Sequence, residues 1–134
     1  DGWRALMLLR SRVRGGFWQG VSGRVEHDDG SLRRAALREL GEELGLDDGI
    51  ALTDLGSWYV FQSAFSGRWL RKRSLAARLP AGSSAATLTL SEEHVEARLV
   101  TFDVARALVR WDENVAELHA LERQLAQRPM RPSE

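Results

Sequence analysis

The sequence predicts an α/β fold that combines a mixed β-sheet with one internal helix and with further helices near the C-terminus. Apolar stretches typical of strands lie on both sides of residues 31–45. Within that range leucine and alanine recur every four residues, which is the spacing of a buried helical stripe. A second helical pattern covers residues 112–127. The overall pattern is therefore a sheet with one internal helix and helices at the end.

The chain of 134 residues is long enough to bury roughly two-thirds of its unfolded surface. We expect one domain over residues 1–127 and no linker. Residues 128–134 contain two prolines, and we expect this tail to be disordered. The sequence lacks an initial methionine and starts almost directly on an apolar run. We therefore expect that an N-terminal piece has been trimmed or left out.

Composition excludes several classes of function. Nineteen basic residues balance nineteen acidic ones, which gives no support for binding a nucleic acid polymer or a membrane surface. The absence of cysteine excludes disulfides, zinc–thiolate sites and thiol nucleophiles. No stretch approaches the roughly 20 apolar residues of a membrane span. No signal peptide is visible either, so a cytoplasmic enzyme is expected.

The first third of the chain alternates extended stretches with turns. Residues 4–10 are predicted to form a buried strand. A basic turn at residues 11–16 leads to a second extended stretch at 17–25, which Gly20 and Gly23 interrupt. Residues 26–30 then form a polar loop before the internal helix.

The internal helix has recognisable ends and a recognisable buried side. Ser31 or Asp29 can cap its N-terminus, and Gly45 follows where a C-cap belongs. The acidic side chains lie off the buried stripe, so we expect them to face outward into a cleft. The stripe itself consists of Leu32, Ala36, Leu40 and Leu44, widened by Ala35 and Leu37.

The rest of the chain continues the strand pattern and ends in helices. Aromatic residues are frequent in the strand that precedes the hairpin turn at Ser66 and Gly67. The predicted elements are strands at 51–55, 57–65, 69–79, 87–90 and 97–102, a flexible loop at 80–86, a short helix that Asp103 caps and that runs to Val109, and a longer helix at 112–127.

Three carboxylates of the internal helix share one face. Glu39, Glu42 and Glu43 are spaced by three and four residues, and like charges at that spacing repel each other. Arg38 can pair with Glu42, but one guanidinium cannot neutralise three carboxylates. A solvated acidic helix face is the simple interpretation. Glycine turns on both sides of the helix favour the other one, a site for a hard divalent cation with oxygen ligands.

Residues 38–46 resemble the second half of the Nudix box, G-x5-E-x7-R-E-U-x-E-E-x-G-U, where U is aliphatic. The resemblance implies a Nudix α/β/α sandwich with a mixed β-sheet, one Nudix-box helix and C-terminal helices, in which the family's first strand is short or absent. It also implies metal-dependent hydrolysis of a diphosphate linkage. Every fixed position is matched, by Arg38, Glu39, Leu40, Glu42, Glu43, Gly45 and Leu46.

The first half of the box departs from the family pattern. Fourteen residues separate Gly23 from Arg38, where the pattern has thirteen. Counted back from Arg38, the first-half glutamate falls on Gly30. Asp28 and Asp29 lie nearby and are candidates to substitute for it. A one-residue loop insertion costs little free energy, so the departure concerns support of the metal site rather than folding.

Further segments resemble the bacterial dihydroneopterin triphosphate pyrophosphohydrolases, a Nudix subfamily that removes diphosphate from a pterin triphosphate. Related Nudix enzymes with similar segments act on nucleotides, so the substrate stays open. The similar segments are Phe17-Trp18-Gln19, Val21-Ser22-Gly23 and Val25-Glu26, which resemble FWQ-x-V-[ST]-G-x-V-E, together with Glu93-His94, Trp111 and Asn114.

These resemblances imply roles for individual residues. Mg²⁺, or Mn²⁺ in its place, is bound by the box glutamates and the backbone carbonyl of Gly23. Arg38 orients the glutamates. Glu93 acts as general base or as a further ligand, although a surface acid is its simple interpretation. The implied metal ligands are Gly23, Glu39, Glu42, Glu43 and Glu93, and the implied catalytic residues are Arg38, Glu42 and Glu93.

Substrate contacts are assigned more broadly. Trp18 adjoins the glycine loop and is the best candidate to stack on a pterin or base, although strand aromatics are commonly core residues. Arg71 and Arg73 share one face of a strand and can hold phosphates, or they form the solvated face of a hairpin. The three histidines lack metal-ligand spacing, so none is assigned to zinc.

The sequence thus predicts a metal-dependent pyrophosphohydrolase acting on a nucleoside or pterin triphosphate. The expected partner is a small phosphoanhydride substrate, and the oligomeric state stays open between a monomer and a homodimer. Two alternatives remain. One is a housekeeping Nudix hydrolase of ADP-ribose or dinucleoside polyphosphates, and the other is a degenerate Nudix module that binds without hydrolysis.

Overall fold

The computed structural model describes residues 2–127, so the tail predicted to be disordered lies outside the described residues. The elements follow the predicted order of strands, internal helix, strands and C-terminal helices. They are β1 (Ala5–Arg10), β2 (Trp18–Gln19), α1 (Leu32–Leu44), β3 (Leu52–Gln62), β4 (Trp69–Ala77), β5 (His94–Val100), α2 (Phe102–Leu108) and α3 (Asp112–Gln127), with 3-10 turns η1 (Arg12–Arg14), η2 (His27–Asp29) and η3 (Ala85–Thr87).

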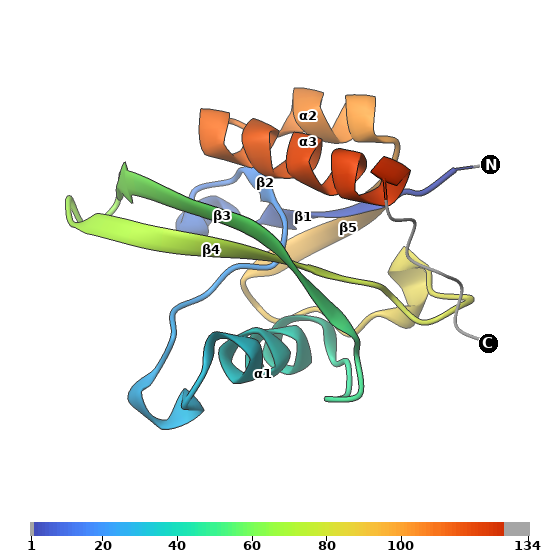
Figure 1. Cartoon of the computed structure of the whole chain (residues 1–134), viewed down its shortest axis with the longest axis horizontal. Helices are drawn as coiled ribbons and strands as arrows, with labels where there is room; N and C mark the ends of the chain where they lie inside the picture. The colour runs from blue at the N-terminus through green and yellow to red at the C-terminus, as the bar shows by residue number, and fades with distance from the viewer. Residues whose placement is uncertain (1, 128–134) are drawn as a thin grey trace.

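Three layers make up the fold. Helix α1 lies on one side of the strands, and helices α2 and α3 lie on the other (Figure 1). The α/β prediction is thereby confirmed. The sheet differs from the single mixed sheet that was expected. The strands form a sheet of order β2-β1-β5 and a separate β3-β4 ribbon, all with antiparallel ladders, and a single isolated parallel bridge joins Trp18 to Val109 within residues 2–127.

Several element boundaries also differ from the prediction. Only two residues of the 17–25 stretch enter a ladder, and residues 20–25 form no strand. The strand predicted at 87–90 is instead the turn η3 followed by irregular chain. Strands 51–55 and 57–65 merge into β3, whose pairing is irregular around Gly56. Thr101, rather than Asp103, caps α2 by accepting the Val104 N–H.

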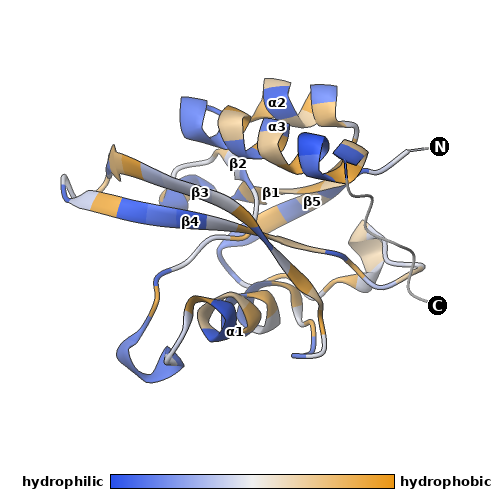
Figure 2. Ribbon diagram, viewed as in Figure 1, coloured by the Kyte–Doolittle hydropathy of each residue, from blue (hydrophilic) through white to orange (hydrophobic). Residues whose placement is uncertain are grey.

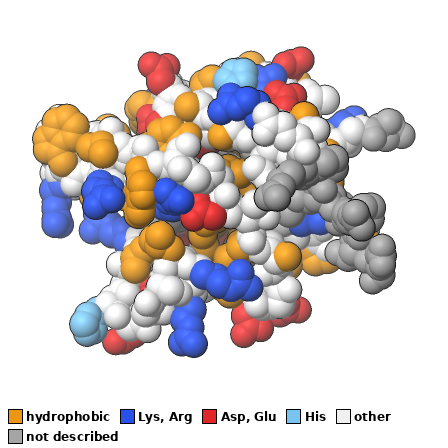
Figure 3. Space-filling model, in the orientation of Figure 1, with side chains coloured by type: hydrophobic (Ala, Val, Ile, Leu, Met, Phe, Trp, Pro, Cys, Tyr) orange, Lys and Arg blue, Asp and Glu red, His pale blue; other side chains and the backbone are white. Residues whose placement is uncertain are grey.

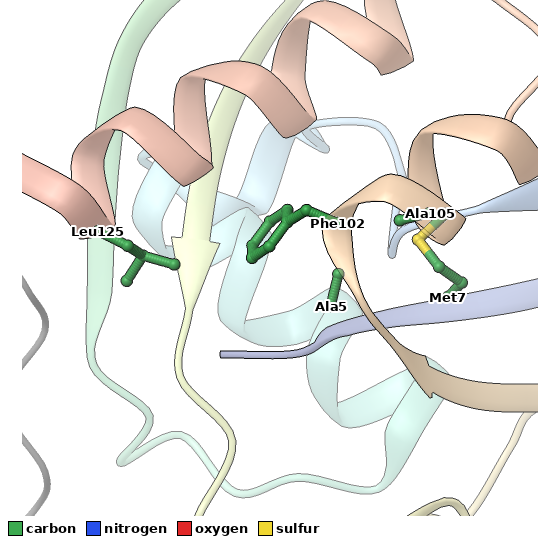
Figure 4. Close-up of a cluster of buried hydrophobic side chains, with 5 residues drawn as sticks. All are labelled: Ala5, Met7, Phe102, Ala105 and Leu125. Carbon is green, nitrogen blue, oxygen red and sulfur yellow. The ribbon is translucent and has the colours of Figure 1, made fainter. Parts of the chain in front are cut away.

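Alternation along β1 divides the core into two clusters. Leu8 points to the α1 side and packs with Leu40, Leu44 and Ile50. Ala5 and Met7 point to the other side. There they pack against the C-terminal helices through Phe102, Ala105 and Leu125 (Figure 4).

Helix α1 ends as predicted. The Ser31 hydroxyl accepts the Arg34 N–H at 3.1 Å, and Gly45 takes the left-handed conformation at φ 70°. Leu40 and Leu44 are buried as the stripe requires, whereas Leu32 at the first turn is 39% exposed. The C-terminal half of α1 is therefore the half that packs on the sheet. No helix within residues 2–127 is long and apolar enough to cross a membrane.

Candidate active site

The carboxylates of α1 do not all face outward, which corrects the prediction. Glu43 is only 2% exposed. The side chain of Glu39 is 18% exposed and that of Glu42 is 56% exposed. Glu43 is buried because it lies beside the packed C-terminal half of the helix. Its two carboxylate oxygens have no hydrogen-bond partner among the described residues.

Burial and neighbouring charge act together on this carboxylate. Burial, together with the nearby carboxylates of Glu39 and Glu93, raises the pKa of Glu43 to about 8, against the opposing effects of Arg10 and the Ser22 backbone. Burial also raises the pKa of Glu39, against the opposing effect of Arg38. Two acids with pKa values raised by desolvation and by neighbouring carboxylates stabilise a positive charge placed among them. The structure thus gathers Glu39, Glu43 and Glu93 into one electrostatic site.

Gly23 lies directly against Glu39. A Cβ atom at residue 23 would be 2.0 Å from Cδ of Glu39 and 2.1 Å from its Oε1. Any side chain at this position would displace the carboxylate. The glycine of the loop is therefore required for this close approach to Glu39.

Arg38 joins the loop before α1 to the acidic face of the helix. Its Nη1 donates to Glu39 Oε1 and to Glu42 Oε2, both at 3.0 Å. Its Nη2 donates to the backbone oxygen of Arg24 at 2.7 Å. Its Nε donates to Asp29 Oδ1 at 2.8 Å, and Nη2 also reaches Asp29 Oδ2 at 3.1 Å. This one guanidinium therefore links two glutamates of the helix to the loop that precedes it.

Asp29, a candidate substitute for the first-half glutamate, lies against Arg38. It is 7% exposed, and it also accepts the Glu26 N–H at 2.7 Å within η2. The Arg38 hydrogen bonds lower the pKa of Asp29, and the Glu26 N–H adds to that effect. The loop contains the 3-10 turn η2, and Gly30 leaves that turn at φ 77°. Asp29 has a shorter side chain than glutamate and lies one residue before Gly30, and it still reaches Arg38.

Glu93 lies on the segment that leads into β5, next to the turn that follows β1. Ser11 N–H donates to the Glu93 backbone oxygen at 2.8 Å. The Glu93 carboxylate pairs with Arg14 at 2.9 Å, and its side chain is 35% exposed. Glu93 is therefore close enough to influence Glu39 and Glu43, and it retains access to solvent.

The same segment is fixed to the end of α1. Thr89 N–H donates to the Leu44 carbonyl at 3.1 Å, and Ser91 N–H donates to the Glu43 carbonyl at 3.2 Å. These amides satisfy carbonyl groups that a helix leaves unpaired at its C-terminus. Glu93 and Glu43 are consequently held at one place by backbone contacts between distant parts of the chain.

A buried polar pair lies behind Glu43. His94 Nε2 is 3.6 Å from Glu43 Oε1 and 3.4 Å from Gln19 Nε2. Both residues are less than a tenth exposed. Sequence reasoning assigned neither residue a role of its own. A glutamine inside an apolar stretch and a histidine at the start of a strand were the available signals.

The predicted stacking residue lies on the other side of the sheet. Trp18 packs against the Ala5 and Met7 cluster, and the Arg98 guanidinium lies 5.0 Å from its ring centroid. Its neighbour Gln19 points to the α1 side, as alternation along a strand requires. The structure therefore does not bring Trp18 to the carboxylates.

Arg71 and Arg73 share a face of the ribbon, as the alternation predicts. Their guanidinium carbons lie 4.5 and 5.1 Å from the Trp58 ring centroid. Arg73 also pairs with Asp54 at 2.9 Å. Figure 2 shows β4 hydrophilic over its middle, and Figure 3 shows Lys and Arg side chains beside hydrophobic ones over the ribbon. No contact joins either arginine to the glutamates of α1 among residues 2–127.

A large hollow lies away from the carboxylates. It measures about 910 Å³ and lies between β1, β4 and α3, with Ser74, Asn114 and Glu117 among its polar lining residues. Leu40 and Leu44 line it from the α1 side, but none of the predicted metal-binding glutamates does. The chemistry of the acidic cluster, rather than the size of this hollow, identifies the candidate active site.

The donor set fits a hard divalent cation. In residues 2–127 no three Asp, Glu or His side chains stand close enough together to form a ready metal cluster. Arg38 and Arg14 hold Glu39, Glu42 and Glu93 in ion pairs. Glu43 still presents two buried oxygens without partners, and oxygen donors are those that Mg²⁺ and Mn²⁺ prefer.

The chain is similar to one protein family and to a curated relative of a different name. The NUDIX domain family model matches residues 1–121. A curated relative, the octanoyltransferase of Myxococcus xanthus, is 36% identical over 109 residues, which are 80% of this chain and 28% of the relative. The chain thus spans little more than a quarter of that relative's length.

Two solved structures show the similarity in three dimensions. A Listeria monocytogenes protein assigned as a NUDIX hydrolase is 29% identical, with a TM-score of 0.78 over 97% of this chain and 88% of the other. The dihydroneopterin triphosphate pyrophosphohydrolase of E. coli is 24% identical, with a TM-score of 0.74 over 89% of this chain and 85% of the other. At 24% identity, the similarity to the E. coli enzyme is a similarity of fold alone.

Proposed function

Because this chain belongs to the Nudix family and is a hydrolase, we propose that it cleaves a nucleoside or pterin triphosphate in a Mg²⁺- or Mn²⁺-dependent reaction that releases diphosphate. The observation that carries this proposal is the buried Glu43, whose orphaned oxygens lie in the field of two further carboxylates. Such a group is costly in the folded protein unless a positive charge joins it. A cation bound beside Glu43 offsets that free-energy cost.

Different residues of the chain have different roles in this reaction. Glu39, Glu42, Glu43 and the Gly23 carbonyl hold the cation. When bound, the cation neutralises phosphate charge and makes a water molecule more acidic. Arg38 keeps Glu39 and Glu42 aligned through its ion pairs.

The reaction itself is a hydrolysis. Water attacks a phosphorus atom of the triphosphate, the phosphoanhydride P–O bond breaks, and the products are a monophosphate and diphosphate. Glu93 is 35% exposed and is the candidate to accept the water's proton, or to add one more oxygen ligand. Its partner Arg14 is available to meet the negative charge of the phosphates when it leaves Glu93.

The substrate class rests on sequence resemblance and fold similarity together. The segments around Trp18, Gly23 and Glu93 resemble the dihydroneopterin triphosphate enzymes, and the E. coli enzyme of that name shares the fold. A pterin triphosphate is therefore the first substrate to test, followed by the nucleoside triphosphates. Arg71 and Arg73 are retained as candidate phosphate contacts on the exposed ribbon, and Trp18 as a candidate only if its side of the sheet takes part.

A substrate panel tests the proposal. Dihydroneopterin triphosphate, nucleoside triphosphates, ADP-ribose and diadenosine polyphosphates are incubated with the protein, with and without Mg²⁺, and the products are identified. We expect Mg²⁺-dependent release of diphosphate from a triphosphate. Glu43→Gln should lower this rate by more than the about 10–100-fold that loss of an outer-shell partner costs, because it removes a ligand itself.

Glu92→Gln is the matched control, since Glu92 is exposed and adjoins Glu93. It should behave like the wild type. Hydrolysis of ADP-ribose or dinucleotides in preference to triphosphates would support the housekeeping alternative. Metal binding or ligand binding without turnover of any substrate would indicate the non-catalytic module.

A further inference from the structure

Three aromatic side chains from distant parts of the chain form one cluster. Phe17, just before β2, and Trp111, just before α3, make an edge-to-face pair with ring centroids 4.6 Å apart. Phe65, from the turn between β3 and β4, stacks on Phe17 at 6.1 Å. Phe17 is only 7% exposed, whereas Phe65 is 69% exposed. The aromatic cluster of Phe17, Phe65 and Trp111 therefore joins a buried ring to the surface.

Two arginines lie against this aromatic cluster. The guanidinium carbons of Arg10, the last residue of β1, and Arg110, between α2 and α3, are 5.4 and 5.5 Å from the centroid of the Phe17 ring. The guanidinium carbon of Arg110 is also 5.4 Å from the centroid of the Trp111 ring. Cation–π attraction at these distances holds a guanidinium in place without using its N–H donors. Both side chains are thus positioned by the rings.

Neither of these arginines has a carboxylate partner. Within residues 2–127 no ion pair joins Arg10 or Arg110 to an acid, and Arg10 uses only Nε, which donates to the backbone oxygen of Arg14 at 2.8 Å. Arg14 itself pairs with Glu93 at 2.9 Å. Three neighbouring guanidinium groups therefore have one carboxylate between them, although the chain as a whole carries no net charge. Such an excess of donors favours an anion.

The three arginines border the candidate active site. Arg10 is the cross-strand partner of His94, the residue after Glu93. The N–H of Ser11 donates to the Glu93 backbone oxygen at 2.8 Å, and Arg14 contacts the carboxylate of the same residue. The positively charged site thus adjoins the acidic cluster at Glu93.

We propose that Arg10, Arg14 and Arg110 bind the unesterified terminal diphosphate of a triphosphate substrate, which is the group that leaves on hydrolysis. The forked N–H donors of a guanidinium match the oxygens of a phosphate group. Arg14 exchanges the Glu93 carboxylate for a phosphate oxygen, and this exchange releases Glu93. The assignment rests on the proposed function and deepens it, because it names the part of the substrate that is recognised.

The candidate substrates differ at the end of their phosphate chains. A nucleoside or pterin triphosphate ends in two phosphates that carry no further ester. In ADP-ribose and the diadenosine polyphosphates both ends of the phosphate chain are esterified. A site for a terminal diphosphate therefore favours triphosphates, whereas solvated arginines without a ligand would not discriminate between these classes.

Inorganic diphosphate is the probe that tests this site. It is titrated calorimetrically into the protein in the presence of EDTA, so that no divalent cation takes part. We expect Arg110→Gln to weaken diphosphate binding by about 10–100-fold, the effect of losing a charged hydrogen-bond partner. Arg110→Lys keeps the charge without the fork and should recover part of the affinity. Arg123→Gln, the matched control, removes an exposed arginine near the other end of α3 and should bind like the wild type.

Equal diphosphate affinity in the wild type and Arg110→Gln would overturn the inference. An equal loss in Arg123→Gln would overturn it too, because net charge alone would then explain the binding. Arg110 is exposed and donates no side-chain hydrogen bond within residues 2–127, so the substitution should not affect folding. If Arg110→Gln nevertheless fails to fold, Arg14→Gln decides in its place, and wild-type affinity in that variant contradicts the inference.

Turnover separates this inference from the proposed function. With a triphosphate, Arg110→Gln should raise KM, and with ADP-ribose it should leave KM unchanged. An equal rise for both substrates would contradict a site for the terminal diphosphate. The proposed function fails separately, if the wild type hydrolyses no triphosphate with Mg²⁺ or Mn²⁺ while its diphosphate binding still depends on Arg110.

Discussion

The contact between Gly23 and Glu39 gives the site a steric requirement at a single residue. The backbone at Gly23 has ordinary φ, so alanine is tolerated there conformationally. The obstacle is the Glu39 carboxylate, which stands where a Cβ atom would be. The end of a glutamate side chain can move aside at little cost to folding. The cost of a larger residue should therefore appear in function and not in stability.

Gly23→Ala is accordingly expected to fold normally and to lose activity. A carboxylate displaced by about 1 Å can cost on the order of 100-fold in rate, and we expect a kcat/KM decrease of that order. Gly20→Ala is the matched control, because a Cβ atom at Gly20 meets nothing within 4 Å and its φ is also ordinary. Equal activity in the two variants would show that Glu39 does not need its present position.

At the scale of elements, the turn η2 and the helix α1 act as one unit through Asp29 and Arg38. The turn places a buried acid where two guanidinium nitrogens reach it. The same guanidinium extends to Glu39 and Glu42. Loosening the turn should therefore disturb the acidic face of the helix, even though Asp29 is outside the set of implied metal ligands.

Asp29→Asn is expected to lower activity and Mn²⁺ affinity by about 10–100-fold, the usual effect of losing an outer-shell partner. Asp28→Asn is the control, because Asp28 is exposed in the same turn. Activity assays and Mn²⁺ titration of both variants provide the comparison. If both variants match the wild type, the loop and the helix are not coupled through this acid.

Asp29→Asn should also change how the free energy of unfolding depends on pH. Because Arg38 lowers the pKa of Asp29 in the folded protein, the carboxylate stabilises the fold above its unfolded pKa of about 3.9. That contribution is lost as pH falls through the lower, folded value. The stability difference between wild type and Asp29→Asn should thus be full above about pH 5 and should shrink in more acidic solution. Urea unfolding as a function of pH measures it, and a difference independent of pH would contradict the linkage.

On the scale of the whole molecule, Glu117 of α3 ties the β3–β4 ribbon to the rest of the fold. Lys72 Nζ donates to it at 2.9 Å, Ser74 donates through its hydroxyl, and Asn114 Nδ2 donates at 3.1 Å. The ribbon shares no ladder with the three-stranded sheet among the described residues, and a hollow separates the two. The Glu117 carboxylate therefore makes much of the polar contact between α3 and the β3–β4 ribbon.

Glu117→Ala should destabilise the protein by about 1–3 kcal/mol, because it leaves the partly buried Lys72 and Ser74 without their acceptor. Hydrogen exchange should become faster in β4 and stay unchanged in α1. Urea unfolding and exchange rates check both statements. Glu113→Ala, one turn earlier on the same helix, is the control and should change neither quantity appreciably.

The parts of this molecule that could be predicted from sequence are those encoded locally. Ser31, the leucine stripe and Gly45 lie within one continuous segment, so the limits of α1 followed from them. The Arg38–Glu43 pattern is equally local. The burial of Glu43, by contrast, depends on which half of α1 packs on Leu8. That choice is made by tertiary contacts.

The remaining differences between the sequence prediction and the structure have the same origin. Trp18 was assigned to the substrate side, but a one-residue step along a strand reverses the face, and only the pairing with Leu9 fixes which face it takes. The role of Asp29 depended on how the inserted residue is accommodated, and a 3-10 turn cannot be read from a count of loop residues. Gln19 and His94 meet only because two strands flank β1.

The backbone bonds from Thr89 and Ser91 to the end of α1 have a consequence for how the protein is made. They join segments separated by the entire β3–β4 ribbon, and such distant closure is slow because chain entropy opposes it. During synthesis the ribosome releases the glutamates of α1 well before Glu93 can reach them. On the nascent chain Glu93 is therefore apart from these glutamates, and only the completed fold brings it to them.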